Sequence, residues 1–440
     1  MRVRRVRAQI LALLGCLASP HVARAQELAD SSRTVPPSFW QATGGVLALN
    51  GLPWIYNWYV QRWPWARIGA RAWGNNLKVG FVWDDDCFLD NQLAHPYHGS
   101  LYLNSARASG YGFWGSLPYV VMGSASWELF LESVKPSLND LVNTTLGGMA
   151  LGEVTYRLSS LLGAKRGPKR NHFVRELGAV ALSPVSQAQG VLRGRERLRG
   201  VVAEPRLEDV GWIGAGGRSD RPYIVFGYEY GSPFDQQATK PYDAFDFSLQ
   251  LGPDPAGLVR HVGVSGLLAR RDLSRSVRSQ LVLGLYQHYE YDDLPRFEAS
   301  GQSLSGALLF QRRLGSRTHL RFGVHVEGLI LGAISSEEGQ YRRRDYDYGP
   351  GAGARFSSSL RLDGRDLLRF DGRLMWLHSI YGAQADHLAS YVRLGTTLRL
   401  GRLLAAGADV GVATRQSWYR GGVSVTRQVP ETRAYLMWSP

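Results

Sequence analysis

The sequence predicts an α+β protein in which an N-terminal helical domain is followed by an antiparallel transmembrane β-barrel of about twelve strands. Three observations support this fold class. The chain starts with a secretory signal, continues through a stretch rich in tryptophan and glycine with helical spacing, and then repeats short alternating apolar and polar segments to its end. A strand with lipid on one side and a wet lumen on the other requires this period of two.

Residues 1–25 have the three parts of a signal peptide. A basic start is followed by an apolar run over residues 10–17 and by the cleavage motif A-R-A, which places the mature N-terminus at Gln26. The alternative is a lipoprotein site at Cys16, although the leucine two positions before it suits such a site poorly. A cleaved signal peptide and a barrel together predict the outer membrane of a Gram-negative bacterium.

The charge of the chain indicates arginine-rich lumen walls and contact with anionic lipid headgroups rather than a nucleic-acid partner. The formal net charge is +14, and the chain stays basic after the five arginines of the signal are removed. The remaining arginines are spread along alternating segments instead of clustering with stacking aromatics, so no nucleic-acid partner is predicted. Cys87 is the one cysteine of the mature chain, which excludes an internal disulfide.

Residues 38–165 are predicted to form the helical domain. Two stretches, 34–61 and 108–127, contain no charged side chain, but proline and glycine interrupt both. An uninterrupted apolar helix would lodge in the inner membrane during export, so this interruption suits an outer-membrane protein. We expect two or three helices that cap the barrel or plug its lumen, with several tryptophans at the lipid interface. Aromatic packing inside a globular domain is the alternative.

Residues 166–220 are predicted to be a basic connector, with a helix over 171–193 that breaks at Pro184. The barrel follows over 221–440. Its predicted strands are 222–231, 243–252, 257–269, 279–291, 302–313, 317–332, 348–362, 367–381, 387–400, 402–416, 420–428 and 431–438. The closing strand, with Trp438, resembles the C-terminal signal that the barrel-assembly machinery recognises, so that machinery and outer-membrane lipid are the predicted partners.

Alternation also predicts which side chains face lipid. Phe370 and Trp376 fall on one face of their strand, and Arg369 and Arg373 fall on the other. A shift of one residue would put these arginines into hydrocarbon at about 2–4 kcal/mol each at the bilayer midplane. We therefore expect the aromatic face outside and the arginine face in the lumen.

The run WDDDCFLDNQLAHPYHG carries the candidate ligands of a divalent metal. Asp86, Asp90, His95 and His98 combine carboxylates with imidazoles, which many divalent metals accept. Pro96 disfavours helical geometry at the residue before it, so we expect a helix to begin at Pro96 and carry His98.

Two further groups of polar residues follow. Glu128 and Glu132 are four residues apart, so they share a helix face and repel unless a cation or hydrogen-bond donors intervene. The alternative is a solvated helix face. Asp140 fits a capping box begun by Ser137, and Glu153 fits an i,i+4 ion pair with Arg157. Each feature alone has a structural explanation.

Together these groups predict one shared polar cluster, because isolated buried polar groups cost several kcal/mol. The cluster is either an internal hydrogen-bond network or a catalytic or metal site. Its candidate residues are His95, His98, Glu128, Glu132, Asp140, Asn143 and Glu153.

Three segments carry a resemblance to a known family. HPYHGSLYLNSARASGYGFWGS, GSASWELFLE and KPSLNDLVNTTLGGMALGEVTYR resemble an uncharacterised bacterial outer-membrane family, domain of unknown function 3943. The resemblance covers motifs in residues 75–195 and departs from the family pattern at 183–186. It implies an envelope protein and no particular reaction.

Two functions are consistent with the sequence. The first is an outer-membrane barrel protein with a helical domain that caps or plugs it, in a structural, scaffolding or passage-related role. The second is an envelope hydrolase or lipid-modifying enzyme that uses the His, Glu and Asp cluster. The sequence has no G-x-S-x-G or H-E-x-x-H motif. It therefore leaves the enzyme question, the substrate and the oligomeric state open.

Overall fold

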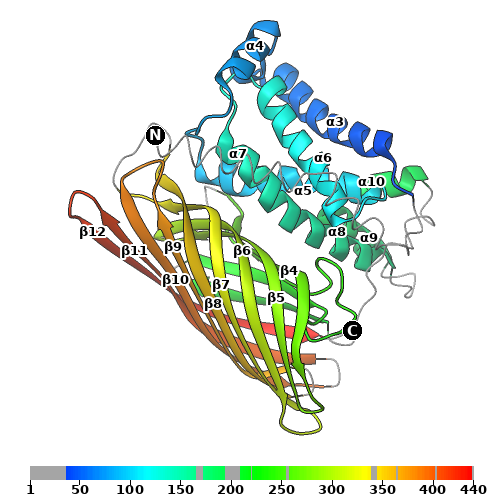
Figure 1. Ribbon diagram of the computed structural model, residues 1–440, viewed down its shortest axis with the longest axis vertical. Helices are drawn as coiled ribbons and strands as arrows, with labels where there is room; N and C mark the ends of the chain where they lie inside the picture. Colours follow the sequence, from blue (N-terminus) through cyan, green and yellow to red (C-terminus); the bar gives the residue numbers. More distant parts are fainter. Residues whose placement is uncertain are drawn as a thin grey trace. The chain divides into compact units, whose positions relative to one another are not determined.

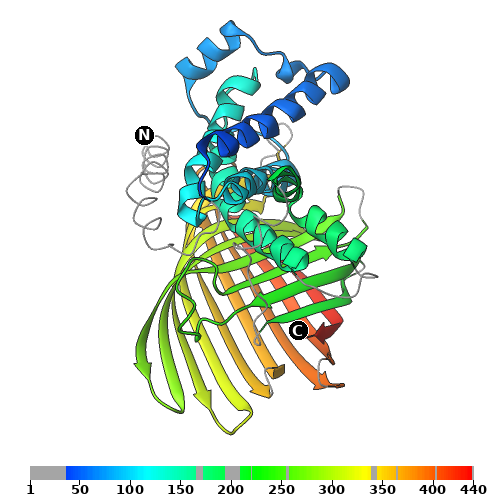
Figure 2. The same ribbon diagram turned by 90° about the vertical axis from the view of Figure 1, so that its right-hand side faces the viewer.

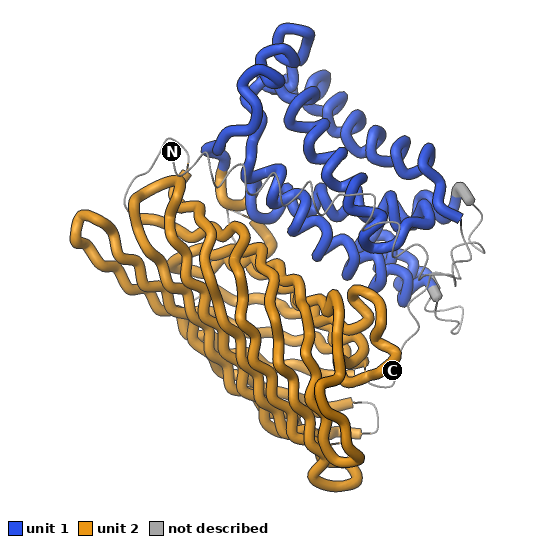
Figure 3. Tube along the Cα trace, viewed as in Figure 1, with its two compact units in different colours: residues 1–86, 90–204 blue, residues 87–89, 205–440 orange. Residues whose placement is uncertain are grey.

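The computed structural model describes residues 36–164, 172–193, 209–219, 221–253, 257–337, 344–362, 365–401 and 404–438. The chain forms two compact units, shown in Figure 3, of which the first comprises residues 1–86 and 90–204 and the second residues 87–89 and 205–440. The predicted signal peptide, including Cys16 and the cleavage site, lies outside the described residues. Helices followed by a closed antiparallel barrel confirm the predicted fold class.

The first unit is helical. Its segments are α3 (Phe39–Tyr56), η1 (Asn57–Gln61), η2 (Pro64–Ala66), α4 (Ala70–Val79), η3 (Asp90–Ala94), α5 (His95–Ala108), α6 (Phe113–Ser126), η4 (Trp127–Leu131), α7 (Leu138–Val142), η5 (Asn143–Gly147), α8 (Gly148–Ala164), α9 (His172–Leu182) and α10 (Pro184–Arg193). Among the described residues, none of these helices has the length and apolar character of a membrane span. Helix α5 packs against α3, α6, α8 and α10 and is therefore the centre of the unit.

Helix α5 starts before the position that the sequence predicts. The π-helical turn η3 leads directly into His95, and Pro96 lies in the first turn of α5. The residue before α5, Ala94, is itself helical, so the chain is helical on both sides of Pro96, and the proline lies directly after the wider π-helical turn. Further along α5, Gly99 lies against the backbone of Thr144 and Gly148, where a Cβ atom would overlap with main-chain atoms.

The second unit contains a closed barrel of twelve antiparallel strands (Figures 1 and 2). The strands are β1 (Val210–Arg218), β2 (Arg221–Tyr230), β3 (Phe245–Leu251), β4 (Val259–Arg275), β5 (Ser279–Leu294), β6 (Phe297–Arg313), β7 (Thr318–Ser335), β8 (Tyr346–Leu362), β9 (Arg365–His378), β10 (Ala385–Arg399), β11 (Leu404–Tyr419) and β12 (Ser424–Trp438). Strand β1 pairs with both β2 and β12, which closes the barrel.

The predicted number of strands is correct, but two of the assignments behind it are wrong. Strand β1 falls within the predicted connector, because its sequence VGWIGAGGR is too rich in glycine to show alternation. Glycine is required where the wall approaches large side chains: a Cβ at Gly216 would overlap with the Tyr223 ring. The predicted strands 420–428 and 431–438 are one strand, β12, which continues through Pro430.

Pro430 is compatible with the barrel because of where its nitrogen points. Its carbonyl accepts a hydrogen bond from the N–H of Ser219 at 3.3 Å, just past the last residue of β1. Since the N–H and C=O of one strand residue point to the same side, the proline nitrogen also faces the end of β1, beyond its last ladder pair. No ladder hydrogen bond is lost there.

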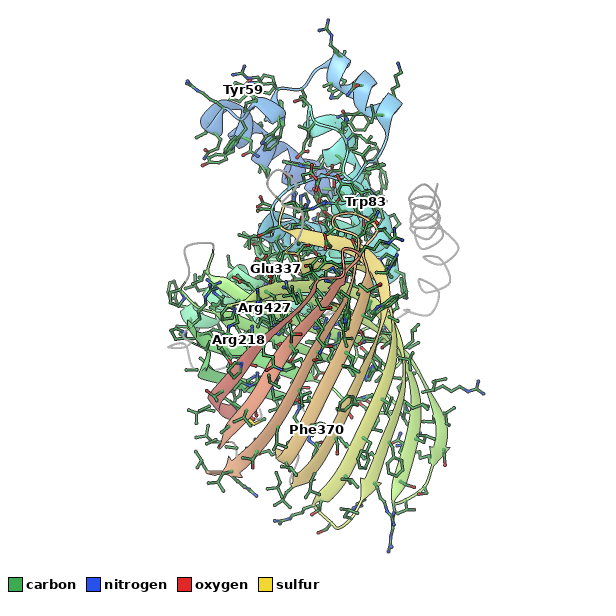
Figure 4. All side chains as sticks on the ribbon, turned by 90° about the vertical axis from the view of Figure 1, so that its left-hand side faces the viewer. Tyr59, Trp83, Arg218, Glu337, Phe370 and Arg427 are labelled. Carbon is green, nitrogen blue, oxygen red and sulfur yellow. The ribbon has the colours of Figure 1, made fainter. Side chains whose placement is uncertain are left out.

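The register confirms the predicted faces of β9. Phe370 and Trp376 lie on the outer face and are 36 % and 43 % exposed. Arg369 and Arg373 lie on the inner face, where they pair with acidic residues of distant strands. Phe370 is labelled in Figure 4.

The inner face of the barrel has three layers. An apolar cluster between the β2–β3 connection and strands β4, β5 and β6 lies towards the β4–β5 turn and comprises Phe234, Ala238, Ala244, Leu267, Val282, Tyr286, Ala307 and Leu309. A second apolar cluster lies towards the β5–β6 turn and comprises Leu294, Phe297, Ala299, Leu329, Ile334, Met375, Leu377, Ala413 and Val429. A band of arginine and acidic side chains separates them along β5, where Glu290 and Asp292 lie between Val282 and Leu294.

Several ion pairs of this band cross the lumen. Arg218 on β1, which is labelled in Figure 4, lies 3.5 Å from Asp292 on β5 and also 3.0 Å from Glu431 on the adjacent strand β12. Arg373 on β9 pairs with Glu290 on β5. Cavities of about 290 and 170 Å³ remain between these side chains. A twelve-stranded wall encloses more space than eight strands do, and here the chain's own side chains and one inward-folded connection occupy much of it.

Candidate functional site

A short parallel bridge in the helical unit brings the predicted acidic run to the start of α7. The N–H of Val82 donates to the carbonyl of Pro136 at 2.8 Å, and the N–H of Leu138 donates to the carbonyl of Val82 at 2.7 Å. This pairing holds the segment around Val82 against the segment around Ser137, so that Asp84 lies beside Asn139. Half of the predicted capping box is present: the hydroxyl of Ser137 accepts a hydrogen bond from the N–H of Asp140 at 3.2 Å, but the N–H of Ser137 donates to Glu128 instead of Asp140.

Asp84 is the most extensively hydrogen-bonded carboxylate of the site. Its Oδ1 accepts hydrogen bonds from Asn139 Nδ2 at 2.8 Å and from Asn91 Nδ2 at 2.9 Å, and its N–H donates to Asn139 Oδ1 at 3.1 Å. Burial alone would raise the pKa of Asp84, but hydrogen bonds from Asp140, Asn139 and other neighbours outweigh burial and lower it. Asp84 is therefore the ionised member of the cluster.

His95, Glu128 and Asp140 converge next to Asp84. One ligand atom from each of the three lies within 4.8 Å of the other two, and Asp84, Asp86 and Asp140 form a second group that meets the same criterion. His95 Nε2 is 3.4 Å from Asp140 Oδ2, and His95 Nδ1 is 3.2 Å from Thr144 Oγ1. Glu128 Oε2 accepts a hydrogen bond from the N–H of Ser137 at 2.7 Å.

Three π-helical turns supply or adjoin these side chains. The turn η3 ends immediately before His95, η4 contains Glu128, and η5 contains Thr144. Such turns insert one residue into a helix and are frequent at functional sites, because they redirect a side chain without ending the helix. The sequence pattern contains no signal for them.

Burial and mutual repulsion oppose ionisation of the remaining carboxyls. Burial raises the pKa of Glu128 well above its usual value, and the charge of Glu132 adds to this effect. Burial likewise raises the pKa of Asp140, with a further contribution from Asp84. For Glu132, burial raises the pKa to about 7. Protons or a cation must therefore neutralise the site near neutral pH.

The imidazole of His95 is suited to bind a metal. Burial lowers its pKa, although the charges of Asp84 and Asp90 oppose that change, so the ring is neutral at neutral pH. Neutral imidazole is the metal-binding form of histidine. Its side chain is 19 % exposed, whereas that of Asp140 is 5 % exposed, so His95 is the more accessible of the two.

Three predicted site residues lie away from this cluster. His98 Nε2 is 3.2 Å from the carbonyl oxygen of Leu49, because His98 is on the next turn of α5 and faces α3. Its ring is tilted against Tyr102 and lies edge-on to Trp127. Burial lowers the pKa of His98 to about 4. Asp90 is exposed and belongs to neither ligand group within the described residues.

Glu153, the third of these, belongs to a separate ion-pair triad. Its carboxylate lies 2.9 Å from the Nε atoms of both Arg107 and Arg157, and it is fully buried. The predicted i,i+4 pair is present, and Arg107 completes it from α5. Glu153 therefore joins α5 to α8 instead of contributing to the site.

Two predicted residues border the cluster. Glu132 Oε1 accepts a hydrogen bond from Trp127 Nε1 at 2.7 Å. Asn143 Nδ2 donates to the carbonyl of Asn91 at 2.9 Å, and its buried Oδ1 has no hydrogen-bond partner among the described residues. Asn143 is thus linked to Asp84 through Asn91, and Glu132 is linked to the residue before Glu128.

The geometry defines a β-barrel protein that carries a buried histidine and carboxylate site in an N-terminal helical unit. Residues 80–185, which include the site, match the family model described as "Domain of unknown function (DUF3943)", and this confirms the resemblance. No curated protein matches the chain.

Several solved barrel structures are similar to part of the chain. The NanC porin is 8 % identical, with a TM-score of 0.31, and the match covers 52 % of this chain and 100 % of the porin. The KdgM porin is 8 % identical, with a TM-score of 0.26 and coverages of 52 % and 99 %. The outer membrane protein Omp33 of Acinetobacter baumannii is 9 % identical, with a TM-score of 0.24 and coverages of 53 % and 97 %.

Proposed function

We propose that this chain is a bacterial outer-membrane protein whose barrel acts as an anchor and whose helical unit binds a divalent cation. The observation that carries the proposal is the convergence of His95, Glu128 and Asp140 within 4.8 Å. One imidazole nitrogen and carboxylate oxygens suit ions such as Mn²⁺, Fe²⁺ or Zn²⁺. A bound cation would also neutralise carboxyls whose ionisation burial opposes.

The lumen favours anchoring over free passage. Arginine and acidic side chains pair across its middle, and an apolar cluster lies on each side of them. A passage role would require these ion pairs to separate. The outward apolar side chains of β9 and the secretory signal support an outer-membrane location, with outer-membrane lipid and the barrel-assembly machinery as partners.

Metal analysis of the full-length protein, purified in detergent from outer membranes, tests the proposal. After loading with Mn²⁺, Fe²⁺ or Zn²⁺ and desalting, we expect about one equivalent of one ion per chain in the wild type. The variants His95→Ala and Glu128→Gln should lose that ion. His98→Ala is the matched control, because this histidine lies one turn along α5 and outside the ligand group.

Two results would refute cation binding. One is a wild type that retains no ion after loading with any of the three metals. The other is a His95→Ala variant that folds and keeps the full equivalent. Thermal unfolding of each variant distinguishes lost metal from a lost fold.

A metal-dependent envelope hydrolase, or another lipid-modifying enzyme, is the second candidate. The partial exposure of His95 favours it, because a cation there could activate a water molecule at an accessible position. Hydrolysis of outer-membrane phospholipids by the metal-loaded protein, absent from the His95→Ala variant, would support an enzyme. Full metal binding without turnover would leave a binding or structural role.

A further inference from the structure

Helix α3 has no distinct polar face. Its sequence FWQATGGVLALNGLPWIY contains no charged residue. One side packs in the unit through Ala42, Val46 and Asn50, and the Nδ2 of Asn50 donates to the carbonyl of Gly123 at 3.0 Å and to Ser126 Oγ at 2.9 Å. The opposite side has no such cover among the described residues.

The uncovered side continues from α3 into η1. We call it the docking face, and its large apolar residues are Trp40 (82 % exposed), Leu47 (60 %), Leu52 (68 %), Ile55 (47 %), Tyr59 (67 %) and Val60 (64 %). Tyr59 is labelled in Figure 4. A contiguous apolar patch on one side of a helix marks a surface that binds a partner or a membrane.

The segment that follows the docking face is basic and aromatic. Residues 36–83 contain Arg62, Arg67, Arg71 and Lys78, all exposed, and no aspartate or glutamate. Trp63 and Trp73 lie among these cations and are 50 % and 40 % exposed. The charged side chains of residues 36–83 are therefore all positive.

We propose that the docking face binds the surface of an anionic phospholipid bilayer. Tryptophan and tyrosine prefer the level of the lipid headgroups, where their rings are half in hydrocarbon and their polar atoms remain wet. Arginine and lysine beside them attract anionic headgroups. The combination of apolar, aromatic and purely cationic side chains matches a bilayer interface better than the mixed charges of a typical protein surface.

The full chain, reconstituted in liposomes, can be tested with lipid-borne quenchers. In a Cys87→Ser background, Leu47→Cys and Ile55→Cys would each carry an environment-sensitive fluorophore. Lys135→Cys is the matched control, because Lys135 is exposed in the same unit and lies outside the docking face. Vesicles would contain phosphatidylethanolamine with or without phosphatidylglycerol, with bromine near the headgroup or deep in the acyl chains.

We expect the labels at positions 47 and 55 to shift to the blue and to be quenched by headgroup-proximal bromine, whereas the label at 135 is quenched by aqueous iodide. Omission of phosphatidylglycerol, or replacement of the four cations by glutamine, should reduce the lipid quenching. Iodide quenching at 47 and 55 in every vesicle would overturn the proposal. So would protection from both quenchers, which would mean that protein, either the barrel or a second copy, covers the face.

Discussion

Arg369 on β9 lies 2.9 Å from Glu229 on β2, across the lumen of the barrel. The shorter way round the wall from β9 to β2 passes four intervening strands. Arg361 on β8 lies 3.2 Å from the same carboxylate, so two cations from one side of the wall meet one anion from the other. Ion pairs across the lumen therefore join opposite sides of the barrel, in addition to the hydrogen bonds between neighbouring strands.

The first prediction concerns ion conductance through the lumen at the Arg369–Glu229 ion pair. Arg369 is 37 % exposed to the lumen, so solvent weakens the pair and we assign it about 1 kcal/mol of coupling. Arg369→Ala combined with Glu229→Ala should then raise the open population about fivefold. Planar-bilayer recordings should show rare openings for the wild type and frequent openings for the double variant.

Two controls make the conductance experiment specific. Arg399→Ala removes an exposed arginine at the end of β10 and should leave conductance unchanged. The exchange Arg369→Glu with Glu229→Arg should restore part of the closed behaviour. Wild-type conductance in the double alanine variant would show that the pair does not restrict the lumen.

The barrel was predictable from the sequence because lipid imposes alternation on most of its wall. Strand β9 shows this most clearly, since Phe370 and Arg369 lie on the predicted faces. Strand β1 was not predictable, because its glycines are required by neighbours such as Tyr223, and those neighbours become known only once the barrel is closed. Pro430 was misleading because a proline breaks a ladder only where a partner needs its N–H.

The candidate site was predictable in composition and not in detail. The sequence identified a cluster around His95, Glu128 and Asp140. It did not show which of His95 and His98 belongs to the cluster, because that depends on which turn of α5 faces α7. Asp84 stands in the same acidic run as Asp86, and its central position follows from the bridge at Val82, which has no local signature.

The second prediction concerns the close approach of α5 to η5 and α8. Gly99→Ala would push a methyl group against the carbonyl of Thr144, a backbone atom that cannot rotate away. We expect a loss of about 1–3 kcal/mol in the stability of the helical unit. Gly44→Ala on α3 is the matched control, because no atom beyond its chain neighbours and the backbone of its own helix turn lies within 4 Å of the position that its Cβ would take, and it should stabilise by up to about 1 kcal/mol. Equal melting temperatures for the two variants would contradict the packing argument.

The third prediction separates Glu153 from the candidate metal site. Glu153→Ala leaves Arg107 and Arg157 without their shared carboxylate, and loss of one partner from a buried ion pair typically costs about 3–5 kcal/mol. The melting temperature should therefore fall steeply. The more conservative Glu153→Gln should keep the metal equivalent at a lower melting temperature. Loss of metal from a well-folded Glu153→Gln variant would place this residue in the site after all.

The last prediction is the pH dependence of the metal-free helical unit. Burial raises the pKa of Glu132 to about 7, with Asp86 and Asp84 adding to the rise and the Trp127 indole opposing it. The folded state therefore holds a proton that the unfolded chain releases near pH 4.5. This contribution to stability is complete below about pH 4.5 and is lost as the pH rises through about 7. In excess chelator, the melting temperature of the unit, followed by far-ultraviolet circular dichroism, should fall between pH 5 and pH 8.

Glu132→Gln identifies the group responsible. The amide oxygen can still accept the hydrogen bond from Trp127, but the side chain stays neutral at every pH, so the decline should become shallower by up to about 1.4 kcal/mol per pH unit. Glu176→Gln on α9, outside the cluster, should leave the slope unchanged. A bound divalent cation should restore stability at pH 8, because it replaces the protons that the carboxyls have lost. A wild-type melting temperature that rises from pH 5 to pH 8 in chelator, or a slope unaffected by Glu132→Gln, would show that this carboxyl is ionised in the folded protein.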